Sequence, residues 1–395
     1  MKILYFCNVN RESKAAVGVF KKIDSQIKVL RNEGHEVHLA FYESDSTYSI
    51  TGANSEKLLS VNLQGIKGNG RTKTVIKKVS EFNKKMKYGC VYSRYETYSL
   101  DLARFYKGLH NEGCTVLLEI PTYPISQRWT TIKTSIEQKN IRVALHQFYN
   151  ATINSLGIFQ FRSGVDKIVN NNGFSEIWKI KTLAINNAAD VASLRKHTAR
   201  RYNGYELHLI GVANVAKWHG FDRIIEGIKA YKKHGGSRNI YFHVVGGGLE
   251  LENLKALSSD PLIRDCIVFH GTVVGKDLDD LFDQADIGVS VLATYRSNMK
   301  NNYDSLKSKE YCARGIPFIT GELEHFYDEK DFVLTVADNG TPINMTDVCA
   351  FADRVLSDVN EAEKIRDFAK AYCGWDYAFR SVINFLKEEN DEKKN

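Results

Sequence analysis

The sequence predicts an α/β protein with two doubly wound domains, and two observations predict it. Short apolar runs of strand length alternate with amphipathic stretches of helix length along the whole chain of 395 residues. The strand-like runs are rich in Val, Ile and Leu, as expected for parallel sheets covered by helices on both faces. With 43% apolar residues, 26% charged residues and only five prolines, the composition is that of a folded globular protein.

The first half of the chain contains one such set of elements. Its predicted strands are residues 3–8, 35–42, 58–63, 90–95, 115–120 and 167–171. Helices are predicted at 17–32 and 100–111, because apolar residues recur there at helical spacing. Gly34 follows the first helix, at the position where a left-handed C-cap belongs.

The second half repeats the pattern. Its predicted strands are 206–213, 240–245, 266–270, 286–292 and 316–320, and its helices are 221–233, 249–258, 277–284 and 305–314. We therefore expect four parts, which are an N-terminal domain (1–189), a polar linker (190–205), a C-terminal domain (206–372) and a last helix with a charged tail (373–395). Two open α/β domains that face each other form a cleft at the carboxyl ends of their strands, where ligands bind.

The charge is unevenly distributed between the halves. Residues 1–200 carry 30 Lys and Arg against 16 Asp and Glu, whereas residues 201–395 carry 24 against 31. The densest basic stretch, 67–87, also has apolar residues at helical spacing, which is typical of a basic amphipathic helix. It fits an anionic membrane surface, or the solvated face of a lysine-rich helix. Nucleic acid is not expected as a partner, because no zinc-finger spacing or aromatic-basic pattern accompanies the charge.

Several classes of protein are excluded by missing patterns. The seven cysteines are scattered without a CxxC pair, so we expect reduced core thiols and no zinc site. No apolar run approaches the ~20 residues that span a bilayer, and no secretory leader is recognisable, so a cytoplasmic location is expected, peripheral on the inner leaflet if the basic stretch binds lipid. The run Gly246–Gly248 is followed by Leu251, so the dinucleotide fingerprint fails, and no GxxxxGK[ST] occurs. A dehydrogenase and a P-loop kinase are thereby disfavoured.

Four segments of the second half carry a family resemblance. They are VANVAKWHGFDRIIEGI (212–228), HVVGGGLELENL (243–254), CIVFHGTV (266–273) and SLKSKEYCARGIPFITG (305–321). In this order they resemble the nucleotide-sugar-binding domain of GT-B glycosyltransferases, of the retaining family 4 type found in bacterial polysaccharide synthesis. The stretches 119–124 and 185–190 of the first half are similar to members of the same family. The resemblance implies a GT-B fold, with two Rossmann-like domains facing across a cleft.

The resemblance assigns the donor site to the second half. Glu310 matches the glutamate that accepts hydrogen bonds from the ribose hydroxyls, an exposed helix carboxylate being the alternative. The glutamate that contacts the donor sugar is replaced by Asn302, and Asp304 is the nearby carboxylate that could compensate. The remaining donor contacts are expected from backbone groups. They are Gly246 and Gly247 after one strand, Phe269, His270 and Gly271 after the next, and Ser305 and Leu306 at a helix N-terminus.

Transfer from a nucleotide sugar builds negative charge on the departing diphosphate, so a cation must be placed there in advance. In the family an Arg and a Lys do this, but Asn214 and His219 stand at the aligned positions here. We expect Lys217 and Lys307 to replace them, with a solvated turn lysine as the alternative for Lys217. The resemblance implies no cofactor and no metal, and no Asp-x-Asp ends a strand.

The first half is expected to bind the acceptor. Gly18 would let the backbone approach the donor without a Cβ in the way. Glu119 ends a strand near the expected anomeric centre and is predicted to be catalytic, a buried structural carboxylate being the alternative. Arg94, Tyr95 and Tyr123 are the candidate acceptor contacts.

Together these patterns predict a retaining glycosyltransferase that uses a nucleotide-diphosphate sugar and a glycan or lipid-linked acceptor. The resemblance implies front-face displacement, without a protein nucleophile. A catalytically silent GT-B subunit that binds a partner enzyme, and a UDP-sugar epimerase of the same architecture, are the alternatives.

Overall fold

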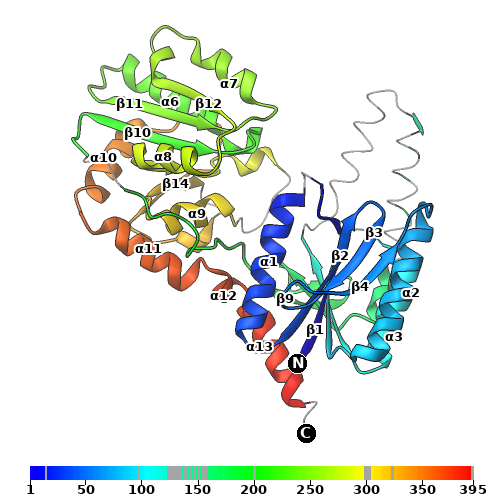
Figure 1. Ribbon diagram of the computed structural model, residues 1–395. Helices are drawn as coiled ribbons and strands as arrows, with labels where there is room; N and C mark the ends of the chain where they lie inside the picture. The colour runs from blue at the N-terminus through cyan, green and yellow to red at the C-terminus, as the bar shows by residue number, and fades with distance from the viewer. Residues whose placement is uncertain are drawn as a thin grey trace. The chain divides into compact units, whose positions relative to one another are not determined.

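The computed structural model describes residues 1–13, 16–95, 98–121, 158–171, 173–198, 202–297, 304–321 and 324–392, with single positions between 136 and 152. The chain forms two compact units (Figure 1). The N-terminal unit comprises Met1–Asn186 together with Phe379–Asn395, and the C-terminal unit comprises Asn187–Ala378.

A mixed sheet in the order β4-β3-β2-β1-β5-β6-β7-β9-β8 forms the centre of the N-terminal unit. Its parallel strands are β1 (Lys2–Asn10), β2 (Glu36–Ser44), β5 (Cys90–Arg94), β6 (Thr115–Ile120), β7 (Lys167–Asn170) and β9 (Ile180–Ala184). The antiparallel strands β3 (Thr47–Thr51), β4 (Lys57–Asn62) and β8 (Glu176–Ile177) extend it at its two edges.

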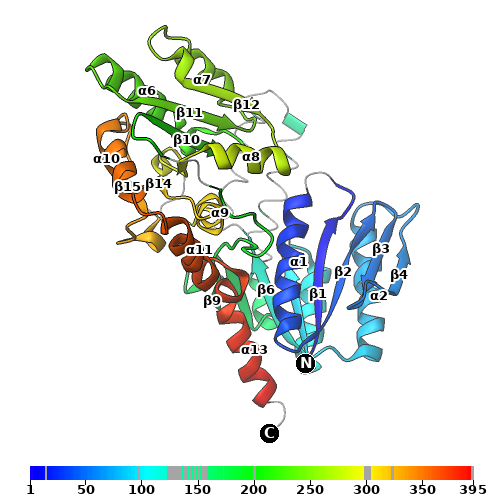
Figure 2. The same cartoon turned by 60° about the vertical axis from the view of Figure 1, so that its left-hand side comes forward.

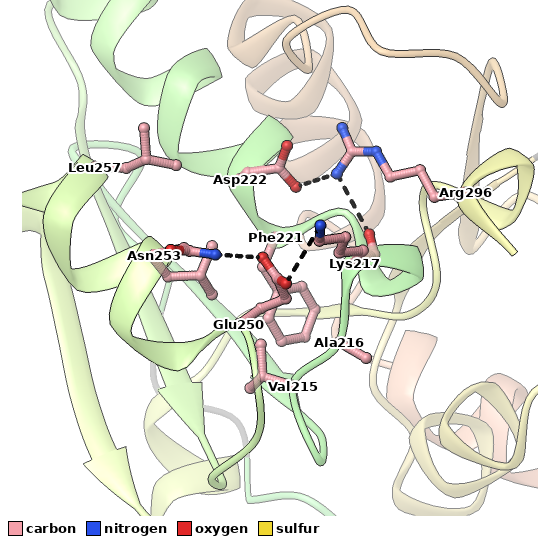
Figure 3. A pocket seen from close by; sticks show the side chains of 10 residues that line it. Val215, Ala216, Lys217, Phe221, Asp222, Glu250, Asn253, Leu257 and Arg296 are labelled. Carbon is pink, nitrogen blue, oxygen red and sulfur yellow. Dashed lines mark hydrogen bonds and ion pairs between the residues drawn. The ribbon is translucent and has the colours of Figure 1, made fainter. Parts of the chain in front are cut away.

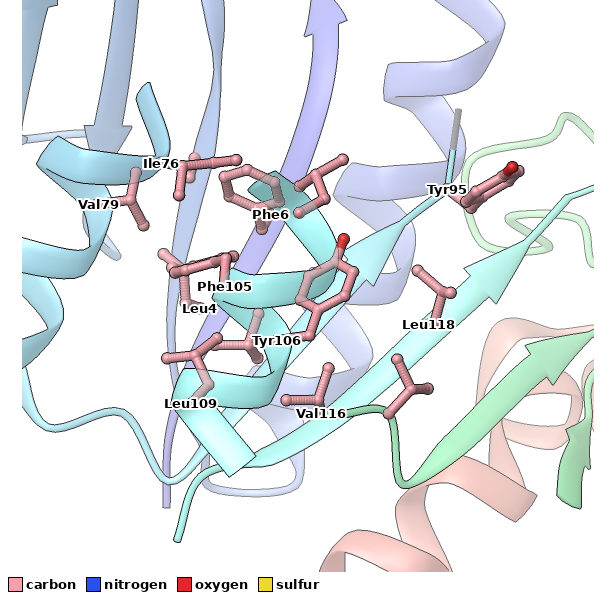
Figure 4. Close-up of a cluster of buried hydrophobic side chains, with 14 of the residues drawn as sticks. Leu4, Phe6, Ile76, Val79, Tyr95, Phe105, Tyr106, Leu109, Val116 and Leu118 are labelled. Carbon is pink, nitrogen blue, oxygen red and sulfur yellow. The ribbon is translucent and has the colours of Figure 1, made fainter. Parts of the chain in front are cut away.

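Helices cover both faces of this sheet. Side chains of β1 alternate, so Leu4 and Phe6 join the core beneath α2 (Asn69–Met86) and α3 (Leu100–Asn111), as Figure 4 shows. Tyr5 points to the other face, where its hydroxyl donates to Gln26 of α1 (Val17–Asn32) at 2.6 Å. Both faces of the sheet are therefore packed against helices, as a doubly wound domain requires.

The last helix of the chain belongs to the N-terminal unit. After α12 (Trp375–Ala378), Phe379 packs on Tyr92 of β5 with ring centroids 5.6 Å apart. Helix α13 (Arg380–Glu392) then places Leu386 in the core, and Lys387 pairs with Glu33 at the end of α1 at 2.8 Å. One unit is thus built from both ends of the chain.

The C-terminal unit is a six-stranded parallel sheet in the order β12-β11-β10-β13-β14-β15. Its strands are β10 (Glu206–Val212), β11 (Asn239–Val245), β12 (Ile267–Gly271), β13 (Ile287–Val289), β14 (Phe318–Gly321) and β15 (Val333–Val336). One face is covered by α6 (Phe221–Lys233), α7 (Leu251–Ser258) and α10 (Met345–Val355). The other is covered by α8 (Lys276–Gln284), α9 (Leu306–Arg314) and α11 (Glu361–Tyr372), and Figure 2 shows this layering from a second side.

The α/β class and most predicted elements are confirmed, and α1, α3, β6 and α6 have the predicted bounds. The strands β3, β8, β9 and β15 were not predicted. The domain scheme differs in two places. Residues 187–198 pack on the C-terminal unit, where His197 N–H donates to the Arg314 carbonyl at 2.8 Å, so this stretch is not a free linker. The last helix and tail were predicted as a separate part (373–395), but from Phe379 onward they belong to the N-terminal unit.

All seven cysteines are buried and reduced, as predicted. Among the described residues, no helix combines the length and the apolar character needed to cross a bilayer.

Replacing Leu386 by Ala tests the placement of α13. The side chain is fully buried, so the free energy of unfolding of the N-terminal unit should fall by about 2–5 kcal/mol, the usual cost of such a truncation. Hydrogen exchange resolved by unit measures this, because amides of β1 and β6 should exchange faster while those of β10 and β11 do not. The matched control is Asn384→Ala on the exposed side of the same helix. An equal loss in both units would contradict the assignment.

Candidate functional site

The C-terminal sheet has the strand order 3-2-1-4-5-6 when its strands are numbered along the chain. All strands are parallel, but successive strands are added toward one edge from β10 to β12 and toward the other edge from β13 to β15. Ligands of such sheets bind at this switch point, beyond the carboxyl ends of the strands. The turn after β10 leads into the short helix η3 (Lys217–His219), and the loop after β13 contacts it, because the Leu292 N–H donates to the His219 carbonyl at 3.1 Å. Gly220 is required at this contact, since its φ is 68° and a Cβ would lie 2.9 Å from that of Leu292.

The glycine run after β11, Gly246–Gly248, packs against the turn after β10. Gly246 has a φ of 120°, and a Cβ there would lie 1.9 Å from the Ala213 carbonyl oxygen. At Gly248, with a φ of 139°, it would lie 2.3 Å from the carbonyl oxygen of Val215. Gly247 differs, because its Cβ position is open and the nearest atom is Thr272 Oγ1 at 3.9 Å. Two of the glycines are therefore needed for packing, whereas the third has room for a side chain and accepts a hydrogen bond from the Val215 N–H through its carbonyl oxygen at 2.6 Å.

Helix α9 is fixed at its N-terminus by a buried carboxylate. Glu324 Oε1 accepts from the Ser305 N–H at 2.8 Å, and Oε2 accepts from the hydroxyls of Ser308 and Thr320 at 2.7 and 2.6 Å. The Ser305 hydroxyl accepts from the Lys307 N–H at 3.2 Å and so caps the helix. Burial raises the pKa of Glu324 to about 7, against the opposing effect of these hydrogen bonds.

Two side chains three residues apart project from one face of α9 at the switch point. Lys307 Nζ lies 3.0 Å from His219 Nε2, and burial lowers the pKa of Lys307 to about 8. Nζ forms no ion pair with a carboxylate of the described residues, although Glu310 and Glu324 act on it at longer range. Glu310 is half-buried, and its carboxylate makes no hydrogen bond or ion pair to any described residue. Within the described part of the chain, a lysine whose partner is a histidine and a glutamate without a partner thus lie one helical turn apart.

A separate pocket of about 220 Å³ lies beside the turn after β10, between the N-terminal ends of α6 and α7 (Figure 3). Lys217 lines it with its Nζ 4.0 Å from Glu250 Oε1, and 69% of the side chain is exposed. Arg296, from η5 (Thr294–Arg296), pairs there with Asp222 at 2.7 Å. Lys217 and Lys307 were predicted to act together, but the structure directs them to different partners.

Glu119 lies in the N-terminal unit, on the sheet face beneath α1. Its carboxylate is fully buried and pairs with Arg94 at 2.7 Å and with Lys22 at 3.0 Å. It also accepts from the hydroxyl of Tyr92 at 2.7 Å and from the amide of Gln26 at 3.2 Å. Burial alone would raise its pKa, but the two cations and these hydrogen bonds lower it to about 2. The surroundings are those of a structural carboxylate that holds α1 on β5 and β6.

No protein-family model matches the chain, and no curated protein matches it. Solved structures do match. A glycosyltransferase from Rickettsia africae superposes with a TM-score of 0.59 at 14% identity, over 98% of each chain. The lipopolysaccharide outer core galactosyltransferase WaaB gives 0.55 at 11%, and HepE of Anabaena, solved with UDP, gives 0.54 at 12%; each comparison covers 98% of this chain and 100% of the other. The fold is GT-B.

Within this GT-B fold, the C-terminal unit brings several predicted donor residues to the carboxyl ends of β10, β11 and β12. Asn214 is exposed on the first turn, Gly247 is open on the second, and His270 and Gly271 end β12. The His270 ring is engaged with His243 of β11 at 3.0 Å. Phe269 packs against the hydrophobic core, so a contact with a base is left to its backbone groups.

The surroundings of two donor residues differ from the prediction. The carboxylate of Asp304 is occupied, since it pairs with the buried Lys309 at 3.2 Å and accepts from the Asn187 N–H. The Ser305 N–H is held by Glu324, so the amide that helix geometry leaves open beside it is that of the exposed Leu306. Asn302 lies outside the described residues.

On the N-terminal side, Gly18 lies in the first turn of α1, exposed and with open space where a Cβ would be. Arg94 is engaged by Glu119. Tyr95 was predicted to contact the acceptor, but it is buried and its ring packs edge-on against Phe161 and Trp178. Tyr123 lies outside the described residues.

Three functional-site features escaped the sequence analysis, namely the carboxylate of Glu324 under α9, the partnership of Lys307 with His219, and that of Lys22 with Glu119. Each joins residues that are distant in sequence. The only sequence signal was the acidic character of the stretch after β14.

Replacing Glu119 by Gln should destabilise the N-terminal unit by about 3–5 kcal/mol at pH 7, because two cations lose a buried partner. A pKa of about 2, below the ordinary value for Glu, stabilises the folded state fully above pH 4.5, and this stabilisation is lost as the pH falls toward 2. Unfolding measured between pH 7 and pH 3 should therefore show a weaker acid dependence in the variant. Glu43→Gln, which breaks the exposed pair with Lys57, is the control and should change stability by under about 1 kcal/mol. An unchanged acid dependence in Glu119→Gln would contradict the assignment.

Proposed function

We propose that the protein is a retaining glycosyltransferase that moves a hexose from a nucleotide-diphosphate sugar to a glycan or lipid-linked acceptor. The proposal is carried by one observation on α9. Among the described residues, Glu310 has no hydrogen-bond or ion-pair partner and the half-buried Lys307 has no carboxylate partner, and both lie on one face of the helix. A ribose supplies hydroxyl donors and a diphosphate supplies negative charge, so a nucleoside diphosphate would satisfy both. The GT-B fold supports the proposal, since HepE was solved with UDP and with UDP-glucose.

In the proposed complex, Glu310 accepts hydrogen bonds from the ribose and Lys307 faces the diphosphate. The N-terminal amides of α9 add partial positive charge on the same side. Gly247, which has open space at its Cβ position, and the strand end at His270 and Gly271 would border the nucleotide. Lys217 lies on the adjacent turn and can approach only by leaving Glu250.

The proposed chemistry is front-face displacement. The bond from the anomeric carbon to the diphosphate oxygen breaks, the acceptor oxygen bonds to the same face, and the departing phosphate oxygen takes the acceptor proton. The protein then contributes positioning and electrostatic stabilisation rather than a nucleophile. We propose that Lys307 and the α9 N-terminus stabilise the leaving group without a metal ion.

A thermal-shift screen with UDP, GDP, dTDP, ADP and CMP tests the donor site. One nucleotide at 100 times its Kd should add about 2.7 kcal/mol to the stability of the folded state. Glu310→Ala should lose the shift, because the ribose loses its acceptor. Glu252→Ala, an exposed glutamate of α7, is the matched control and should keep it.

Either of two results would count against the proposal. Absence of a shift with every nucleotide would favour a silent GT-B subunit. Release of an altered sugar nucleotide without acceptor would instead identify an epimerase.

The acceptor is proposed to lie on an anionic membrane surface that α2 contacts. Its apolar residues Val75, Ile76 and Val79 are buried in the N-terminal core, so they do not insert into lipid. The exposed face is nearly all basic, with Glu81 as its one acidic residue, paired to Lys78. The exposed lysines of α2 and of the residues that flank it (67–87) are Lys67, Lys73, Lys77, Lys78, Lys84, Lys85 and Lys87. Such a face would bind anionic headgroups by charge, without insertion.

Co-sedimentation with liposomes of phosphatidylserine and phosphatidylcholine tests this contact. Binding is expected at low salt and should weaken as salt rises. Changing four α2 lysines to Gln should reduce it strongly, at about 1 kcal/mol per charge. The four are Lys77, Lys78, Lys84 and Lys85. A control with four exposed lysines of the C-terminal unit changed should bind normally; they are Lys255, Lys276, Lys364 and Lys370. Equal binding by the two variants would rule out the α2 surface.

A further inference from the structure

The contact between His219 and Lys307 fixes the protonation of both side chains. His219 Nδ1 lies 3.0 Å from the backbone nitrogen of Ala216, which carries a hydrogen and can only donate. Nδ1 must therefore present its lone pair, and a neutral ring then carries its hydrogen on Nε2. Burial is the largest cause that lowers the pKa of His219 below its ordinary value, so the ring is neutral at physiological pH whichever form Lys307 takes.

The hydrogen on Nε2 points at Lys307. Nζ lies 3.0 Å from Nε2, but an ammonium has three donors and no acceptor, so it cannot receive this hydrogen bond. An uncharged amine has a lone pair and can. The hydrogen bond therefore runs from His219 to Lys307, which requires the amine form of the lysine.

The other charged groups around Nζ do not supply a counterion. Glu310 on α9 and Glu324 after β14 both act to raise the pKa of Lys307, yet burial outweighs them and the pKa lies at about 8. The Glu324 oxygens are committed to Ser305, Ser308 and Thr320. A buried ammonium without a paired anion is costly, and loss of its proton avoids that cost.

We infer that in alkaline solution the ligand-free protein holds Lys307 as a neutral amine under His219, and that this amine takes up one proton when a nucleoside diphosphate binds. The inference rests on the proposed function for the identity of the ligand. The proton comes from solvent and converts the amine to an ammonium, which turns from Nε2 to a phosphate oxygen. His219 keeps its own hydrogen throughout. Above pH 8 the cation is thus formed only when an anion is present to pair with it.

This coupling has a measurable signature. Above the pKa of Lys307, binding of one ligand should consume one proton, so the affinity should fall about tenfold for each unit of pH. Below it the lysine is already charged, and binding should consume none. The phosphates of a nucleoside diphosphate are fully ionised above pH 8, so they do not contribute to the change.

Titration calorimetry with the nucleoside diphosphate that gives the thermal shift tests the coupling. At pH 9, two buffers of different ionisation enthalpy should report an uptake close to one proton, and at pH 6.5 close to none from this group. Lys307→Arg keeps a cation that does not titrate, so its uptake at pH 9 should vanish while binding persists. Lys255→Arg, on the exposed surface of α7, is the control and should show the wild-type uptake.

The two proposals fail in different ways. Binding without proton uptake at pH 9 would overturn the coupling and leave the glycosyltransferase proposal intact. Absence of nucleotide binding would overturn the glycosyltransferase proposal. The charge state of the pair is then tested on the ligand-free protein by two-bond proton–nitrogen correlation of His219 at pH 9. A hydrogen on Nε2 and a bare Nδ1 are expected, and a hydrogen on Nδ1 would overturn the inference by itself.

Discussion

The position of α9 depends on one buried carboxylate. Glu324 follows β14 and accepts hydrogen bonds from Ser305, Ser308 and Thr320, which tie the start of the helix to the end of the strand. Because α9 is nine residues long, fixing its first turn also fixes the directions of Lys307 and Glu310. Only in that geometry could Lys307 face the diphosphate while Glu310 faces the ribose, as proposed. The buried Glu324 therefore fixes the geometry of the proposed donor site without lining it.

The two units contain buried glutamates with opposite titration behaviour. Glu119 has Lys22 and Arg94 beside it, and its pKa is lowered to about 2. Glu324 has only neutral donors, and burial raises its pKa to about 7. Both carboxylates receive several hydrogen bonds, so the difference lies in the neighbouring cations. Glu119 is thus an ionised carboxylate that links α1 to the sheet. Glu324, beside the N-terminus of α9, instead has a pKa near neutral pH.

Much of the fold could be predicted because buried faces of helices and strands show as periodic apolar residues within a short stretch of sequence. Apolar spacing gave α1, α3 and α6 their observed bounds, and the continuous apolar run of β6 did the same. The short β3 was missed because Thr47, Ser49 and Thr51 interrupt its apolar pattern, although its three central residues are buried. The return of α13 could not be predicted, since an apolar helix face shows that a core is covered but not which one.

The site was predictable where a motif spans a single element. Glu310 and Lys307 lie on one predicted helix, and the structure places both on one face of it. The role of Glu119 was not predictable, because its partners Lys22 and Gln26 come from α1, far away in sequence. The same holds for His219, whose burial and contact with Lys307 arise only when β10 and α9 come together. Sequence reasoning identified residue types suited to the chemistry, while their protonation and pairing required the tertiary structure.

The return of α13 has a consequence for the order in which the chain becomes stable during synthesis. The continuous stretch 187–378 has all of its strands and helices once residue 378 has emerged from the ribosome. The N-terminal unit was begun earlier, but the part of its sheet face that Phe379 and α13 cover beside α1 stays exposed until those residues have followed. The unit that starts first therefore finishes second. Until then, its exposed sheet face is the part of the nascent chain most in need of protection from aggregation.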